Sequence, residues 1–181
     1  MMEKINIYTY LYSIKNEYKL LQVKSTDVFN SKKSFLELFL NMYINNEERS
    51  INKFLKDFED EQPTLINGTN YTWCMGVFWK QEFVLFNIVE TREIFEPNNE
   101  YTFVMHYEGG TFISQFNFKE TSINAIINEW VDNYNFVSIN KEKVNNSIKS
   151  QQPIKHNILE NIWEVIDKDC SLNITIIKNN V

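Results

Sequence analysis

Hydrophobic residues along the chain follow two periods, and the changes between them divide the sequence into expected strands and helices. Runs rich in aromatic and β-branched residues predict strands over residues 5–12, 17–24, 71–79, 83–90 and 172–177. The first two of these are expected to pair across a short polar turn. The third and fourth are expected to form another hairpin.

Helices are predicted where apolar residues recur every three or four positions. One helix is expected to begin at Ser31 and a second at Ser50, because either hydroxyl suits a helix N-terminus. Further apolar stripes predict helices over 121–135 and after Pro153. The segment 139–152 is rich in Asn, Lys, Ser and Gln, and we expect a loop there.

The segment 101–118 carries the clearest hairpin signal. Gly109 and Gly110 suit a two-residue turn, since glycine readily takes the positive φ values that such turns require. With this turn the numbers of paired residues add up to 219, so that Tyr101 faces Phe118. One face of the hairpin is then almost wholly apolar and the other is mostly polar, as a half-buried sheet requires.

These elements predict an α+β fold formed by a single domain over residues 1–181. An antiparallel sheet, with a central meander at about 71–118, is expected to pack against several amphipathic helices. The length of the chain favours one domain. We find no internal repeat in the sequence.

Composition narrows the class of protein. The formal net charge is -6 and the pI is about 5.0, which disfavours a nucleic-acid partner and favours a basic protein. Cys74 and Cys170 form neither a disulfide pattern nor a metal pattern. No apolar segment reaches the length of a membrane span, and the first residues lack the pattern of a secretory signal. We therefore expect a cytoplasmic protein without membrane contact.

Motifs for catalysis and cofactor binding are sparse. The four glycines build no phosphate loop, dinucleotide site or nucleophile elbow, and we expect no cofactor, no metal and no catalytic residue. One polar group deserves weighing: His106, Glu108, Thr111 and Gln115 are predicted to share a face of the 101–118 hairpin. This group could support acid–base chemistry, or it could be an ordinary polar sheet face or a partner contact.

Two segments concentrate acidic residues. Residues 47–61 hold six acidic against three basic residues, and residues 87–100 hold four against one. Each is either a solvated surface or a patch that mimics a phosphate backbone for a basic protein. With the hairpin face, these segments give the candidate partner-binding residues Asp57, Glu59, Asp60, Glu61, Glu90, Glu93, Glu96, His106, Glu108 and Gln115.

Two stretches, Trp73-Cys74-Met75-Gly76-Val77-Phe78 and Tyr107-Glu108-Gly109-Gly110-Thr111-Phe112-Ile113-Ser114-Gln115, are followed by a predicted helix. In this order they resemble bacterial immunity proteins of polymorphic-toxin and contact-dependent growth-inhibition systems, over about residues 70–135. The resemblance implies a protein that binds a toxin domain, in many systems a nuclease, and blocks its active site or substrate groove. It assigns no toxin-contact residue.

Two other functions fit the same pattern. An acidic secretion chaperone or adaptor would also be small and α+β. An enzyme that uses the His106 face is the third hypothesis, with His106, Glu108 and Gln115 as its polar groups.

Overall fold

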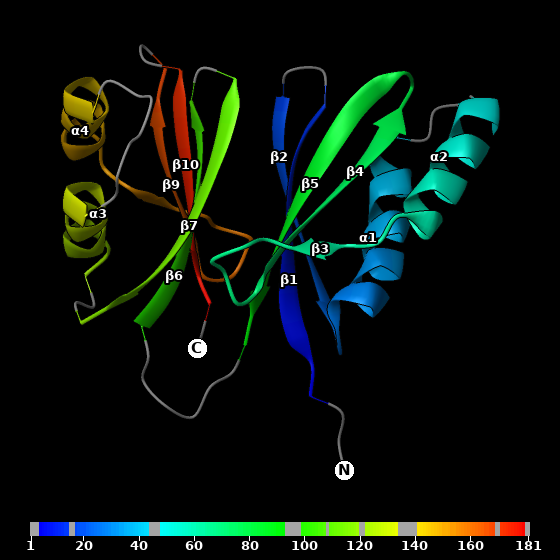
Figure 1. The fold of residues 1–181 in the computed structure, drawn as a ribbon, viewed down its shortest axis with the longest axis horizontal. Helices are drawn as coiled ribbons and strands as arrows, with labels where there is room; N and C mark the ends of the chain where they lie inside the picture. Colours follow the sequence, from blue (N-terminus) through cyan, green and yellow to red (C-terminus); the bar gives the residue numbers. More distant parts are fainter. Residues whose placement is uncertain are drawn as a thin grey trace. The chain divides into compact units, whose positions relative to one another are not determined.

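The computed structural model describes residues 4–14, 17–43, 48–92, 99–107, 109–119, 122–133, 141–168 and 171–179. It confirms the α+β class: these residues form two five-stranded antiparallel sheets and four helices (Figure 1). The chain divides into two compact units, Met1–Glu93 and Ile94–Val181. Each unit has its own sheet and its own hydrophobic core. The assignment of residues 1–181 to one domain stays a prediction.

The first unit runs through seven elements. They are β1 (Asn6–Ile14), β2 (Glu17–Ser25), α1 (Val28–Tyr43), α2 (Glu48–Asp60), β3 (Thr64–Leu65), β4 (Thr72–Trp79) and β5 (Glu82–Thr91). The strands lie in the order β2-β1-β5-β4-β3, all antiparallel. Alternate apolar residues of the sheet pack on both helices, so one face of the sheet forms the core.

An aromatic stack joins α1 to the sheet of the first unit. Phe35 stacks on Tyr10, with ring centroids 4.0 Å apart. The helix begins at Val28 and not at Ser31, because Asp27 caps it: its Oδ1 accepts a hydrogen bond of 2.7 Å from the Asn30 amide. Ser31 is buried and donates to the Val28 carbonyl oxygen. The second helix likewise begins at Glu48, ahead of the predicted Ser50.

The second unit also runs through seven elements. They are β6 (Asn99–Tyr107), β7 (Gly110–Phe118), α3 (Ile123–Asn133), α4 (Lys141–Ser150), β8 (Ile154–Lys155), β9 (Ile162–Asp167) and β10 (Leu172–Lys178). The strands lie in the order β7-β6-β10-β9-β8, again all antiparallel. Figure 1 shows α3 and α4 beside each other, and Trp130 of α3 stacks on Phe103 at 4.5 Å.

Two predicted elements of the second unit are wrong. The expected loop 139–152 contains α4, because Val144 and Ile148 lie one turn apart and are both buried in the core. The helix expected after Pro153 is replaced by β8 and β9, which pair with each other, while β9 also pairs with β10. The apolar spacing imitated a helix there, yet Ile158 is 86% exposed and contributes nothing to a buried stripe.

The hairpin of 101–118 has the predicted faces but a different register. Tyr101 pairs with Phe116 rather than with Phe118, since Tyr107 pairs with Gly110 and the turn therefore falls one residue earlier. Gly109 supplies the positive φ of this turn, at 78°. The partner moves by two residues, and side chains alternate with a period of two, so every residue keeps its face.

The two units share one topology. Both follow the order strand, strand, helix, helix and three strands, and both sheets have the same strand order. Specific contacts recur as well: Gln22 donates to Thr9 Oγ1 at 3.0 Å, and Gln115 donates to Thr102 Oγ1 at 2.9 Å, each across a direct register pair. The structure thus contains an internal repeat, contrary to our sequence reading. The predicted meander 71–118 is divided between the repeats, β4–β5 in one sheet and β6–β7 in the other.

Candidate functional site

Four of the predicted partner-binding residues come together at the end of α2. Glu59, Asp60 and Glu61 are exposed, and Asp57 is half-buried. Their helix ends at Asp60, where the last carbonyl groups also carry partial negative charge. We refer to residues 57–61 as the acidic helix end. Among the described residues, it is the most concentrated group of the predicted acidic side chains.

Glu90 does not join an acidic surface, because its side chain is buried. The residue is 1% exposed and accepts a hydrogen bond of 2.7 Å from Asn6 Nδ2. Arg92 forms an ion pair with it, including a contact of 3.1 Å from Nη2 to Oε2, and the guanidinium lies over the Tyr71 ring. Burial, together with the Glu90 charge, raises the pKa of Tyr8 to about 12. Glu90 therefore belongs to a buried polar cluster of the first unit.

The predicted polar residues on the second sheet do not form one site. His106 pairs with Thr111, and their side chains share a hydrogen bond of 2.9 Å through Nδ1. Gln115 lies four register pairs away and donates to Thr102, with the pair Val104–Ile113 between them on the same face. Burial lowers the pKa of His106 to about 4, so the imidazole is neutral at neutral pH.

The repeat gives Gln115 a structural explanation, because Gln22 makes the same bond at the same place in the first unit. Three further predicted residues, Glu93, Glu96 and Glu108, lie outside the described residues. Of the ten candidates, only the four of the acidic helix end therefore lie together on one described surface.

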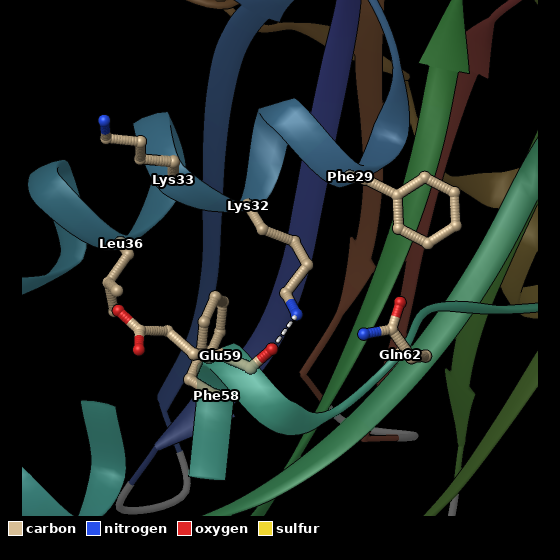
Figure 2. A pocket seen from close by; sticks show the side chains of 7 residues that line it. All are labelled: Phe29, Lys32, Lys33, Leu36, Phe58, Glu59 and Gln62. Carbon is tan, nitrogen blue, oxygen red and sulfur yellow. Dashed lines mark hydrogen bonds between the residues drawn. The ribbon is translucent and has the colours of Figure 1, made fainter. Parts of the chain in front are cut away.

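A pocket of about 480 Å³ lies between α1 and the end of α2 (Figure 2). It is lined by Phe29, Lys32, Lys33, Leu36, Phe58, Glu59 and Gln62. The four lining residues of α1 are spaced by three and four positions, which places them on one face of the helix. The walls are mostly apolar, and Glu59 joins the pocket to the acidic helix end. We refer to this as the α1–α2 pocket.

Lys32 crosses from α1 to the end of α2 inside this pocket. Its Nζ donates to the carbonyl oxygen of Glu59 at 3.3 Å and also to that of Glu61, and it lies over the Phe58 ring. Burial lowers the pKa of Lys32, and the carboxylates of Glu61, Glu59 and Asp60 act in the opposite direction. The ammonium group thus satisfies helix-end carbonyls, as basic groups often do at helix C-termini.

The α1–α2 pocket was not predicted from the sequence. Phe29 precedes the predicted helix start at Ser31, and its 57% exposure on α1 appears only in the folded chain. No sequence rule separates such a residue from one that packs in the core, because both can match the same period.

The second unit has a pocket at the equivalent place, between α3 and the end of α4. It measures about 200 Å³ and is lined by Asn124, Ile127, Asn128, Ile148, Lys149, Gln151, Gln152 and Pro153. Counted from the stacked aromatic, Phe29 precedes Phe35 by the same six positions by which Asn124 precedes Trp130. A Gln-Pro pair follows each second helix, at 62–63 and at 152–153. We refer to this as the α3–α4 pocket.

Comparisons with known proteins add no assignment: no protein-family model, curated protein or solved structure matches this chain. Within the described part of the chain, no three His, Cys, Asp or Glu side chains are placed to hold a metal ion. No helix among the described residues has the length and apolar character needed to cross a membrane.

Proposed function

We propose that this chain is a binding protein for a basic partner, and specifically an immunity protein that neutralises a toxin domain in the cytoplasm. The acidic helix end supports this proposal, since it holds several exposed carboxylates on one surface. Such a surface attracts a cationic cleft and speeds the encounter with it. The toxin would be blocked by occlusion of its active site or substrate groove.

The observation that carries the proposal is the junction of this charge with an apolar pocket. Glu59 belongs to both, and Phe29 presents an exposed aromatic ring at the same pocket. Protein interfaces commonly combine an aromatic or aliphatic contact at their centre with a charged rim. A merely solvated helix end would have no need of the apolar component.

The test is co-expression with the product of the adjacent toxin gene, followed by purification of the complex and titration at increasing salt. We expect a stable complex, weakened by salt, and restored growth of cells that make the toxin. Failure to bind that product at low salt would overturn the immunity function.

A matched pair of variants separates a local surface from overall charge. Glu59→Gln/Asp60→Asn/Glu61→Gln removes the three exposed carboxylates of the acidic helix end, and Glu129→Gln/Glu142→Gln/Glu160→Gln removes the same charge from exposed positions of the second unit. The first variant should weaken the complex about tenfold or more at low salt, and the second should change it little. Equal weakening by both would show that only net charge matters.

A further inference from the structure

The α1–α2 pocket exposes apolar surface to water, and the fold does not require this exposure. Phe29 is 57% exposed, although it stands beside Leu36 and Phe58, which are buried. A cavity of about 150 Å³ is enough to hold benzene. The α1–α2 pocket, at about 480 Å³, therefore has room for an aromatic or long aliphatic side chain.

The second unit shows what the same place looks like without this apolar lining. At the positions equivalent to Phe29 and Lys33 it has Asn124 and Asn128, and Gln151 and Gln152 line the other side. The repeated fold therefore forms in the presence of amide side chains here. The apolar character of the α1–α2 pocket is a property of the first unit and not a demand of the topology.

Charge at the rim also differs between the two pockets. Glu59 occupies the position that Lys149 occupies in the second unit, where Lys149 is paired with Asp132 at 2.9 Å. Lys32 is turned inward to the end of α2, and Figure 2 shows Lys33 pointing away from the other lining residues. The carboxylates of Glu59, Asp60 and Glu61 all lie close enough to act on the Lys32 amine. A ligand in this pocket would thus meet mostly apolar walls and two lysines with one carboxylate, that of Glu59. Because the Lys32 ammonium is bonded to carbonyl groups at the end of α2, a cation of the ligand could be received by the carboxylates of Glu59 and the neighbouring Asp60.

We infer that the α1–α2 pocket receives an aromatic or long aliphatic side chain of the basic partner, with a lysine or arginine of the same segment placed on the carboxylates of Glu59 and Asp60. This inference rests on the proposed function and names the contact that the partner makes. The aliphatic or aromatic part of the segment excludes water from Phe29, while its cation answers the charge of the helix end.

A pair of small molecules tests the pocket without the partner. 3-Phenylpropylamine carries an aromatic ring and a cation, and 3-phenylpropionate carries the same ring with an anion. Each is titrated into the ¹⁵N-labelled full chain while amide shifts are followed by NMR. We expect the amine to shift amides of α1 and of the end of α2, and the carboxylate to bind about fivefold more weakly or worse.

Two variants with matched chemistry locate the effect. Phe29→Asn installs the residue type that the second unit has at this place, so the helix should still fold. Phe78→Asn removes another aromatic side chain of the same unit, 53% exposed on β4, outside the pocket. Phe29→Asn should weaken binding of the amine about fivefold or more, and Phe78→Asn should leave it unchanged.

The outcomes distinguish this inference from the proposed function. If the toxin complex forms but the amine does not bind the pocket and Phe29→Asn leaves the complex intact, the inference is overturned and the immunity function stands. Amine binding that Phe29→Asn abolishes, with no toxin complex, supports the pocket and overturns the immunity function. Equal or tighter binding of 3-phenylpropionate would overturn the cationic part of the inference.

Discussion

The two units place the same elements around pockets of opposite character. Both pockets lie between paired helices, at equivalent positions on the first helix and at the end of the second. The α1–α2 pocket has mostly apolar walls and joins the acidic helix end at Glu59, whereas most of the residues that line the α3–α4 pocket are amides and a lysine, beside Ile127, Ile148 and Pro153. One architecture thus holds two different surfaces in a single chain.

The difference shows which positions the fold constrains. The aromatic contact between the first helix and the sheet keeps its character between units. Phe35 stacks on Tyr10 in the first unit, and their counterparts Trp130 and Phe103 stack on each other in the second. Several residues at the pocket differ in character, as Phe29 does from Asn124 and Glu59 from Lys149. Core packing limits the first group, while solvent-facing positions are free to acquire a binding role.

Truncating the stacked aromatic of either helix should have the largest effect on stability. Phe35→Ala and Trp130→Ala should each lower the free energy of unfolding by about 3–5 kcal/mol, because each removes a large side chain from a closely packed core. Both side chains are at most 1% exposed. Urea denaturation followed by fluorescence or circular dichroism measures the loss.

The same two variants also test how separate the repeats are. Every buried residue of the first core cluster comes from residues 8–88, and every one of the second from 101–176. Amide hydrogen exchange should therefore lose protection mainly in the sheet of the substituted unit. An equal loss in both sheets would show that the units unfold together, and the comparison of independent repeats would fail.

Much of the fold could be predicted from the chain because the strong patterns are local. The strands at 6–14, 72–79 and 82–91 follow from runs of aromatic and β-branched residues. Weak patterns failed: α4 has few buried residues in a polar sequence, and β8 and β9 are short strands whose apolar spacing also fits a helix. Pairing with β10, which lies further along the chain, decides that segment, and no local rule contains this information.

The repeat and the site were harder to predict, each for its own physical reason. Sheet positions accept different apolar residues, so Leu11 and Val104 fill equivalent places without sequence identity. The acidic helix end could be identified from its charge alone. The α1–α2 pocket requires two helices to meet, and Phe29 and Gln62 come together there only in the folded chain.

His106 should make stability depend on pH in a way that its counterpart does not. The equivalent position in the first unit is Ser13, which is exposed. Burial lowers the pKa of His106 from its ordinary value of 6.5 to about 4. As the pH falls below 6.5, this histidine therefore binds a proton in the unfolded chain before it does so in the folded chain. Stability should therefore fall by roughly 3 kcal/mol as the pH drops from about 6.5 to about 4.

His106→Ser gives each unit the same residue at this position and should remove that contribution. Urea denaturation of both proteins at pH 7 and at pH 4.5 measures it, and carboxylates that titrate in the same range cancel in the difference. An identical loss of stability on acidification in the wild type and the variant would show that His106 is protonated without cost in the folded chain.

Lys32→Ile should have the smallest effect on stability. It tests whether the partly buried ammonium stabilises the helix end at the α1–α2 pocket. Ile127 occupies the equivalent position in the second unit and is buried, so an apolar residue fits there. The substitution removes the hydrogen bonds from Lys32 to the carbonyl oxygens of Glu59 and Glu61, two exposed residues, where water can replace the ammonium as donor. It also removes a partly desolvated charge. These effects oppose each other, and we expect stability at pH 7 to change by less than about 1 kcal/mol.

The dependence on alkaline pH identifies which effect is larger in Lys32→Ile. Burial lowers the pKa of Lys32 below its ordinary value of 10.5, so just below pH 10.5 the unfolded wild type binds a proton that the folded wild type has released. The wild type therefore gains stability relative to the variant as the pH rises through the lowered pKa toward 10.5, and tyrosines that titrate there cancel in the difference. Paired urea denaturation at pH 7 and pH 10 measures this gain. Lys32→Ile could instead lower the free energy of unfolding by more than about 2 kcal/mol at pH 7, with the same difference from the wild type at pH 10. That result would mean that the hydrogen bonds to the α2 carbonyls dominate, and that the ammonium stabilises this helix end in a way that an isoleucine cannot.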